Sequence, residues 1–252
     1  MSSFFYHRFQ SNGTGLTCTK KTMTHLLNKT AYITGGSKGV GYGIAKVLLE
    51  HGMNVAITGR NLSSVEKAAS SLTKDASRIL AIQSNVSSMQ DEVNAIAKTV
   101  AKFGQIDVVV ANAGVGYFLP FEQLTEAQWH EMIDTNLTGV FNTVKAALIE
   151  LKKCRGYVIT ISSLAGTNFF ENGSGYNASK FGLVGFTQAM MLDLRKYGIK
   201  TTTIMPGSVA TYFNNHTPTA EDAWKIQPED IGELVVDVLK IPERSLPSKI
   251  EV

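Results

Sequence analysis

Six short runs of apolar and β-branched residues constrain the fold of this 252-residue chain more than any other feature. They lie at residues 30–34, 54–58, 78–83, 107–112, 156–162 and 200–205, and stretches with helical periodicity separate them. Their interiors are continuously apolar, as in VVVAN and YVITIS, which is typical of strands that are buried on both faces. We therefore predict an α/β fold, a doubly wound parallel sheet of six or seven strands with helices on both faces.

One domain accounts for residues 29–252, because no Pro/Gly/Ser-rich linker and no internal repeat interrupts this alternation. A chain of this length that is 44% apolar can bury a large core. The irregular stretch at residues 212–228 is predicted to form a modest lid.

Residues 1–28 precede the first strand and show neither helical nor strand periodicity, so we predict a disordered N-terminal extension. Met23 could be the natural start, which would make the leader a consequence of start-site choice. The acid-free, Ser/Thr-bearing composition also resembles an organelle transit peptide, although Arg is scarce and no amphipathic helix is evident.

Charge and cysteine usage exclude several classes of protein. The first 49 residues hold six basic residues and no acid, which leaves 18 basic against 21 acidic residues in the remainder, so a broad nucleic-acid surface is not expected. No apolar run is long enough to span a membrane. Cys18 and Cys154 lie far apart, and the five histidines are scattered, so we expect no metal and no disulfide framework. A reducing, cytoplasmic location fits this composition best.

The first strand runs directly into a glycine-rich turn, TGGSKGVG, with glycines at 35, 39 and 41. Such a turn lets backbone amides and the helix that follows, expected at residues 42–51, approach a pyrophosphate. By itself the turn is weak evidence for dinucleotide binding, because its spacing departs from GxGxxG. On the turn alone, the chain could also be a methyltransferase.

Further motifs follow the later strands: Asn112-Ala113-Gly114, Ser163, Tyr176-Asn177-Ala178-Ser179-Lys180, and Pro206-Gly207 followed by Thr211. Together with the glycine turn, this set resembles the short-chain dehydrogenases/reductases over residues 29–252, with members like the 3-oxoacyl-carrier-protein reductases sharing it. The resemblance implies a Rossmann fold that binds a nicotinamide dinucleotide.

Tyr176 and Lys180 are four residues apart, so on a helix their side chains share one face. A nearby ammonium favours the ionised phenol, so we expect Lys180 to lower the pKa of Tyr176 and make it a better acid. Ser163, at the end of a strand, can donate to a carbonyl oxygen as charge develops on it. The resemblance adds Asn136 as the residue that holds a water leading to the lysine.

The resemblance also implies the cofactor contacts. The pyrophosphate turn, the residues after the third and fourth strands, the catalytic helix and the segment after the sixth strand would supply them: Gly35, Ser37, Lys38, Gly39, Val40, Gly41, Asn85, Val86, Asn112, Ala113, Gly114, Tyr176, Lys180, Pro206, Gly207, Val209 and Thr211. Asn85 stands where the family usually has Asp, so we expect the adenine pocket to keep an acceptor oxygen with a changed hydrogen-bond pattern.

The residues after the second strand predict NADP(H) rather than NAD(H). Gly59 stands where NAD-preferring members carry an acid that binds the ribose 2′-hydroxyl, and Arg60 follows it. Lys38 is the other position at which NADP-preferring relatives carry a basic residue. Both cations are predicted to meet the 2′-phosphate, with Arg60 contributing more.

Three functions remain open at this stage. The first is NADPH-dependent reduction of a carbonyl, including a 3-oxoacyl thioester; the second is the reverse oxidation of an alcohol; the third is a non-catalytic redox sensor that binds nucleotide. The catalytic set disfavours the sensor. An apolar or aromatic substrate pocket is expected from Tyr117, Phe118, Phe169, Phe170, Tyr212, Phe213 and Trp224. Glu221 and Asp222 against Lys225 on the lid argue against docking of an acidic carrier protein.

Two long helices, at residues 125–152 and 176–196, are expected to form the subunit interfaces of a homotetramer, or else of a homodimer. Trp129, Met132, Met190 and Met191 are the apolar residues predicted to be buried there.

Overall fold

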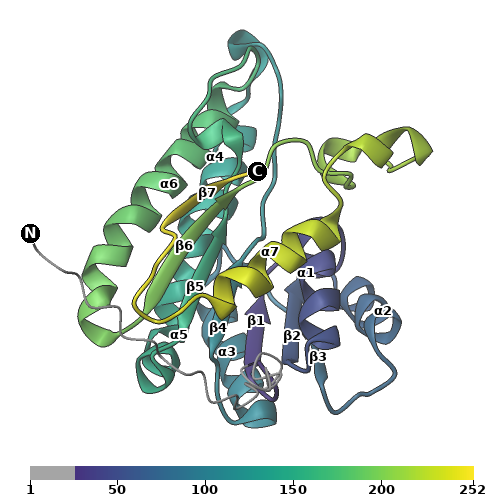
Figure 1. Ribbon diagram of the computed structural model, residues 1–252. Helices are drawn as coiled ribbons and strands as arrows, with labels where there is room; N and C mark the ends of the chain where they lie inside the picture. The colour runs from purple at the N-terminus through teal and green to yellow at the C-terminus, as the bar shows by residue number, and fades with distance from the viewer. Residues whose placement is uncertain (1–25) are drawn as a thin grey trace, which may run out of the picture.

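Seven parallel strands form one sheet in the computed structural model, which describes residues 26–252. The strands are β1 (Thr30–Ile33), β2 (Asn54–Gly59), β3 (Ile79–Gln83), β4 (Val108–Ala111), β5 (Tyr157–Ile161), β6 (Lys200–Met205) and β7 (Lys249–Glu251). The six strands named from the sequence are confirmed to within one residue at each end, and β7 is an additional edge strand. Their spatial order is β3-β2-β1-β4-β5-β6-β7 (Figure 1).

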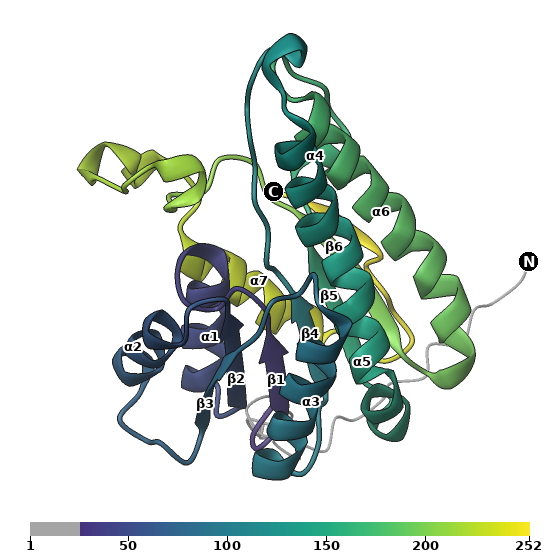
Figure 2. The same ribbon diagram turned by 180° about the vertical axis from the view of Figure 1, so that it is seen from behind.

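Helices cover both faces of the sheet. They are α1 (Gly39–Glu50), α2 (Leu62–Leu72), α3 (Met89–Phe103), α4 (Glu126–Ile133), α5 (Gly139–Cys154), α6 (Ser174–Leu194) and α7 (Pro228–Lys240). Residues of α1, α2 and α7 form one core cluster, with α1 and α7 in front of the sheet in Figure 1. Residues of α3, α5 and α6 form the second cluster, on the face turned forward in Figure 2. The predicted doubly wound α/β fold is confirmed.

Alternation along each strand explains why two cores exist. In β1, Ala31 and Ile33 belong to the first cluster, whereas Tyr32 belongs to the second. The strands are buried on both sides, which is why their sequences are continuously apolar. The strand order reverses between β1 and β4, and ligands of such sheets bind at this switch point, outside the carboxyl ends of the strands.

The folded domain begins earlier than residue 29. Leu26 is buried in the first cluster, and the Asn28 amide donates to the Gly52 carbonyl at 3.0 Å. Residues 26–28 therefore belong to the fold rather than to an extension. The prediction for residues 1–25, including a start at Met23, lies outside the described residues.

Two helices differ from the sequence-based expectation. The helix α1 begins at Gly39 rather than at Tyr42, so two of the three glycines lie in its first turn. The helix expected over residues 125–152 is interrupted by one π-helical turn, Asp134–Thr138, between α4 and α5. This turn contains the buried Asn136, and π turns often occur at functional sites because they reposition a side chain within a helix.

No helix in the described part of the chain is long and apolar enough to cross a membrane.

Candidate active site

The glycine turn after β1 is tightly packed, which explains its glycines. Gly35 and Gly39 have φ of +66° and +59°, in the left-handed region that favours glycine. A Cβ on Gly41 would lie 2.5 Å from the Asn112 amide nitrogen and 2.6 Å from the Gly35 carbonyl oxygen. A side chain here would fill the space beside the turn. The geometry therefore fits the close backbone approach that a pyrophosphate requires at a helix N-terminus.

Asn112 connects this turn to the end of β4. Its side-chain nitrogen donates to the carbonyl oxygens of Thr34 (2.9 Å) and Gly35 (3.2 Å), and its backbone amide donates to the Thr34 hydroxyl at 3.0 Å. Both amide protons are thus used to hold the turn. Ala113 donates to the same hydroxyl. Gly114 follows these residues, and a Cβ on it would be 3.7 Å from the Lys180 ammonium, which places the end of β4 beside α6.

The end of β2 lies beside the same turn. The Gly36 amide donates to the Thr58 carbonyl at 3.0 Å, and a Cβ on Gly59 would lie 3.7 Å from the Ser37 hydroxyl. The side chain of an acid at position 59 would therefore lie near the turn. Glycine at this position leaves no negative charge there. Arg60 and Lys38 are both exposed at this edge, and Val40 lies in the first turn of α1.

The segments after β3 and β6 carry the remaining residues that were predicted to contact the cofactor. Val86 is buried, while Asn85 is exposed, and its side-chain oxygen accepts the Ser87 amide at 3.2 Å. This local bond uses one lone pair of the acceptor oxygen that we expected for adenine, so Asn85 keeps a second lone pair and its NH₂ group for other partners.

After β6, the Pro206 carbonyl accepts the Leu164 amide, and the Gly207 amide donates to Val252. Val209 forms an isolated bridge to Ile226. Thr211 is buried, and its side chain would lie 3.4 Å from a Cβ on Gly39, which brings this segment against the pyrophosphate turn.

Asn136 fixes the segment after β4 from the π turn. Its Oδ1 accepts the Val115 amide at 2.8 Å, and its Nδ2 donates to the Val115 carbonyl (2.8 Å) and to the Ser179 hydroxyl (2.9 Å). The side chain thus supports the site through protein contacts, and its Oδ1 retains a second lone pair. Ser179 was not among the predicted site residues; the only signal for it was its place between Tyr176 and Lys180.

Tyr176 and Lys180 lie one turn apart on α6, as predicted. The Lys180 ammonium donates to the Ile161 carbonyl at 3.1 Å and lies 5.7 Å from the centroid of the Tyr176 ring. Burial lowers the pKa of Lys180 to about 8.

The pKa of Tyr176 differs from the expectation. Burial raises it to about 12, and the only opposing contribution is a hydrogen bond from Ser163, whose hydroxyl also accepts the Ala165 amide at 3.1 Å. Proximity in sequence predicted that Lys180 would lower this pKa, but Lys180 is not among the groups that shift it, and burial of the phenol decides the direction.

Aromatic rings surround Tyr176. Phe118 meets it edge-on with centroids 5.2 Å apart, and Phe213 lies 5.7 Å away, tilted by 52°. Phe170 packs edge-on against Phe118, and Tyr117 joins the same small cluster. Of the other predicted pocket residues, Tyr212 and Trp224 are exposed, and Phe169 stacks on Phe181 at 5.0 Å instead.

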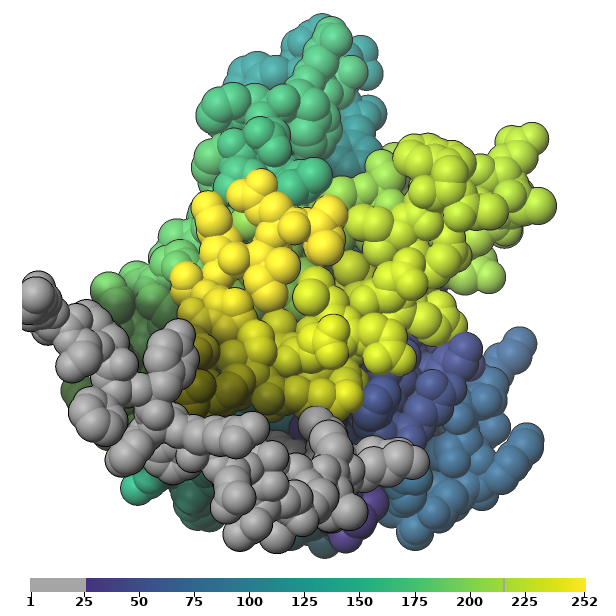
Figure 3. Space-filling model, in the orientation of Figure 1, coloured from purple at the N-terminus to yellow at the C-terminus, as the bar shows by residue number. Residues whose placement is uncertain are grey.

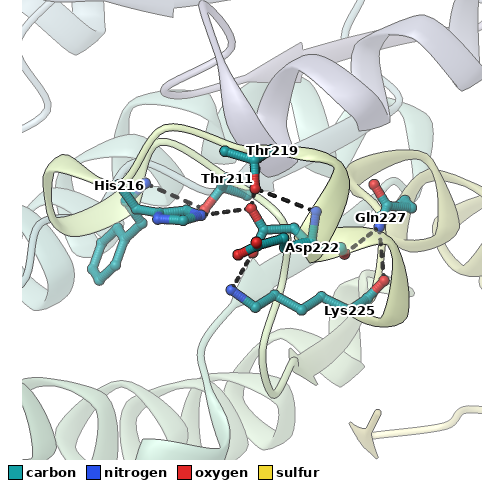
Figure 4. A network of polar contacts seen from close by, with 8 residues as sticks. Thr211, His216, Thr219, Asp222, Lys225 and Gln227 are labelled. Atoms are coloured by element: carbon teal, nitrogen blue, oxygen red, sulfur yellow. Dashed lines mark hydrogen bonds and ion pairs between the residues drawn. The ribbon is translucent and has the colours of Figure 1, made fainter.

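The predicted lid, residues 212–228, is organised around Asp222. This carboxylate is buried and accepts from the His216 ring (2.7 Å), the Thr219 amide (2.9 Å) and the Lys225 ammonium (Figure 4). From the sequence, we expected Asp222 and Lys225 to be surface charges. In the structure they instead form an ion pair within the lid. Figure 3 shows the lid as a yellow-green lobe that stands out from the body of the molecule.

No group of three or more metal-ligating side chains occurs among residues 26–252, and Cys154 is a free thiol there; Cys18 lies outside the described residues.

The fold and the site together define a class of dinucleotide-binding α/β enzymes that carry a Ser-Tyr-Lys set. A sequence profile described as short chain dehydrogenase matches residues 29–222, and the chain belongs to that family.

Individual relatives are also similar over most of their length. The 3-oxoacyl-[acyl-carrier-protein] reductase of Chlamydia muridarum is 38% identical over 188 residues, which cover 74% of this chain and 76% of the relative. An uncharacterized oxidoreductase of Staphylococcus aureus (strain MRSA252) is 32% identical over 232 residues, which cover 91% and 99% of the two chains.

Solved structures agree with this placement. An alcohol dehydrogenase from the archaeon Thermococcus sibiricus, complexed with 5-hydroxy-NADP, is 31% identical, with a TM-score of 0.83 over 89% of this chain and 95% of the other. A metagenomic short-chain oxidoreductase in complex with NADP is 27% identical, with a TM-score of 0.79 over 91% of this chain and 98% of the other.

Proposed function

We propose that this chain is an NADPH-dependent reductase that converts an apolar or aromatic ketone or aldehyde to the alcohol. The observation that carries the proposal is the convergence of Ser163, Tyr176 and Lys180 next to a cluster of aromatic rings, on the same side of the sheet as a glycine turn whose packing fits a dinucleotide. When bound, NADPH supplies the hydride.

The protein residues supply the proton and hold the carbonyl. With a pKa of about 12, the phenol of Tyr176 stays protonated at neutral pH and so carries a proton that it can donate to the carbonyl oxygen. The Ser163 hydroxyl lies beside it and donates to the carbonyl oxygen as negative charge develops there. Lys180 stabilises the tyrosinate that remains after the proton has left, and it binds the nicotinamide ribose.

Several observations support NADPH over NADH. Gly59 leaves no acid beside the turn, and Arg60 and Lys38 are exposed at the same edge. Two charge-assisted contacts to a 2′-phosphate would favour NADPH on the order of a hundredfold before solvent screening. The two structural relatives above were solved with NADP or a derivative of it.

The cofactor test compares kcat/KM for NADPH and NADH in the wild type, Lys38→Ala and Arg60→Ala at two salt concentrations. We expect a preference for NADPH that shrinks with each substitution, more for Arg60, and with added salt. Equal use of the two cofactors by the wild type would refute this part of the proposal.

A 3-oxoacyl thioester is the second candidate substrate, favoured by the similarity to the Chlamydia muridarum enzyme. Nicotinamide absorbance should be followed with purified protein and a panel of aryl ketones, aliphatic ketones and an acetoacetyl thioester. Fastest turnover of aryl ketones would support an aromatic pocket, whereas a preference for the thioester would support the second candidate. Cofactor binding without turnover of any carbonyl would leave the non-catalytic redox sensor.

A further inference from the structure

A bridge of three side chains connects the cofactor edge of the sheet to the substrate side. Arg60, just after β2, lies with its Nη1 3.1 Å from Oε1 of Glu131 on α4. The other oxygen of this carboxylate, Oε2, accepts the hydroxyl of Tyr117 at 2.5 Å. Tyr117 belongs to the segment after β4 and to the cluster that surrounds Tyr176. The bridge thus joins segments from the two sides of the switch point between β1 and β4.

Glu131 is held in the ionised form and in one orientation. The hydrogen bond from Tyr117, and then the contact with Arg60, lower the pKa of its carboxyl group. Its side chain is 34% exposed, whereas that of Arg60 is 67% exposed. The guanidinium therefore has one N–H engaged by the carboxylate, while the rest of its fork faces solvent.

We propose that Glu131 is a specificity-determining residue that competes with the cofactor's 2′-phosphate for Arg60 and so limits the preference for NADPH. The inference rests on the proposed function, in which Arg60 meets that phosphate. A phosphate that approaches Arg60 either breaks its ion pair with Glu131 or lies close to a carboxylate of the same charge. The uncharged 2′-hydroxyl of NADH does neither. The bridge therefore weakens the binding of NADPH and leaves the binding of NADH unchanged.

The size of the effect follows from the exposure of the pair. Ion pairs at a surface contribute up to about 1 kcal/mol, which corresponds to about fivefold in a dissociation constant. The Tyr117 hydroxyl adds to the competition only by holding the carboxylate toward Arg60. Its removal should act in the same direction as removal of the charge, with a smaller change.

The experiment measures the Kd of NADPH and of NADH, without substrate, for five proteins: the wild type, Glu131→Gln, Tyr117→Phe, Arg60→Ala and the double variant of Glu131 and Arg60. We expect Glu131→Gln to bind NADPH about fivefold more tightly and NADH within about twofold of the wild type. In the Arg60→Ala background the same substitution should give no gain. Glu126→Gln is the matched control, because Glu126 lies on the same helix, is exposed, and within residues 26–252 forms an ion pair with His130 alone, at 3.6 Å.

Three results would overturn the proposal: weaker NADPH binding by Glu131→Gln, an equal gain for NADH, or a gain that persists without Arg60. The first would mean that Glu131 positions Arg60 for the phosphate instead of competing for it. The proposed cofactor preference fails separately, if Arg60→Ala alone leaves the Kd of NADPH unchanged.

Discussion

Lys180 is a cation whose burial costs stability and whose charge the proposed mechanism uses to stabilise the tyrosinate. It is 4% exposed and has one hydrogen-bond partner, the Ile161 carbonyl. Its pKa falls from 10.5 to about 8, so between these values the folded protein binds fewer protons than the unfolded chain. The free energy of unfolding therefore rises with pH in this window, and below pH 8 the cost of the buried charge is present in full.

Lys180→Met should remove this pH dependence together with activity. Relative to the wild type, the variant should gain stability below pH 8, by up to on the order of 3 kcal/mol, with the gain disappearing toward pH 10.5. Denaturant unfolding at several pH values measures the difference. Lys67→Met, on the exposed side of α2, is the control that should show no such trend. A constant difference across the window would contradict the burial argument.

Tyr176→Phe tests the proton donor directly. The substitution keeps the ring that packs on Phe118 and Phe213, so the pocket should remain intact. We expect kcat for carbonyl reduction to fall by at least about a hundredfold, with the Kd of NADPH nearly unchanged. Retained turnover would place the acid elsewhere.

The lid contacts Tyr176, the proposed proton donor, through the ring of Phe213. Phe213 packs against both Tyr176 and Phe118, at centroid distances of 5.7 and 6.2 Å. Aromatic pairs contribute about 0.5–1.5 kcal/mol beyond the area they bury, which corresponds to roughly 2- to 12-fold in binding. Phe213→Ala should raise KM for aryl ketones within this range and change kcat less. Trp224→Ala, on the same lid but 75% exposed, should change neither constant.

Asp222 holds the lid together through three partners, and its loss should loosen this element alone. Lys225, the Thr219 amide and His216 lower the pKa of its carboxyl group, so the ionised form persists at neutral pH. In Asp222→Asn, we expect faster hydrogen exchange and proteolysis in residues 212–228, with unchanged exchange in β1 and β4. Glu221→Gln is the neighbouring control. Equal protection from hydrogen exchange in the two variants would show that other contacts, and not those of Asp222, hold the lid.

Elements that depend on neighbouring residues in the chain could be predicted from the sequence. Features that depend on contacts between distant segments could not. Strands buried on both faces and a YxxxK on one helical face can be read from periodicity alone. The π turn at Asn136 could not, because no local pattern marks it; the partner of its side chain, Val115, lies twenty-one residues away. The same holds for the Arg60–Glu131 pair, whose members lie on different elements, and for the raised pKa of Tyr176, which results from burial in the folded chain.

At the scale of the whole molecule, α5 and α6 present an apolar surface away from the sheet. Phe141 and Phe186 lie 6.4 Å apart across the two helices, so their outer faces are continuous. Phe141, Ile149 and Leu192 are 45%, 68% and 63% exposed. The residues first expected at this surface are partly different: Met132 and Met190 are buried within the chain, and Trp129 is 39% exposed.

This surface is where we predict that two copies of the chain meet, within a homotetramer. Exposed apolar side chains that are contiguous on two helices favour a self-complementary contact about a two-fold axis. Ile149→Glu would place a charge in the centre of such a contact, with a desolvation cost of several kcal/mol per interface. Light scattering should give a tetrameric mass for the wild type and a smaller mass for the variant. Val93→Glu, at a 43% exposed apolar position on α3, should keep the wild-type mass. A monomeric wild type at micromolar concentration would contradict the prediction, and a tetrameric Ile149→Glu would place the contact on another face.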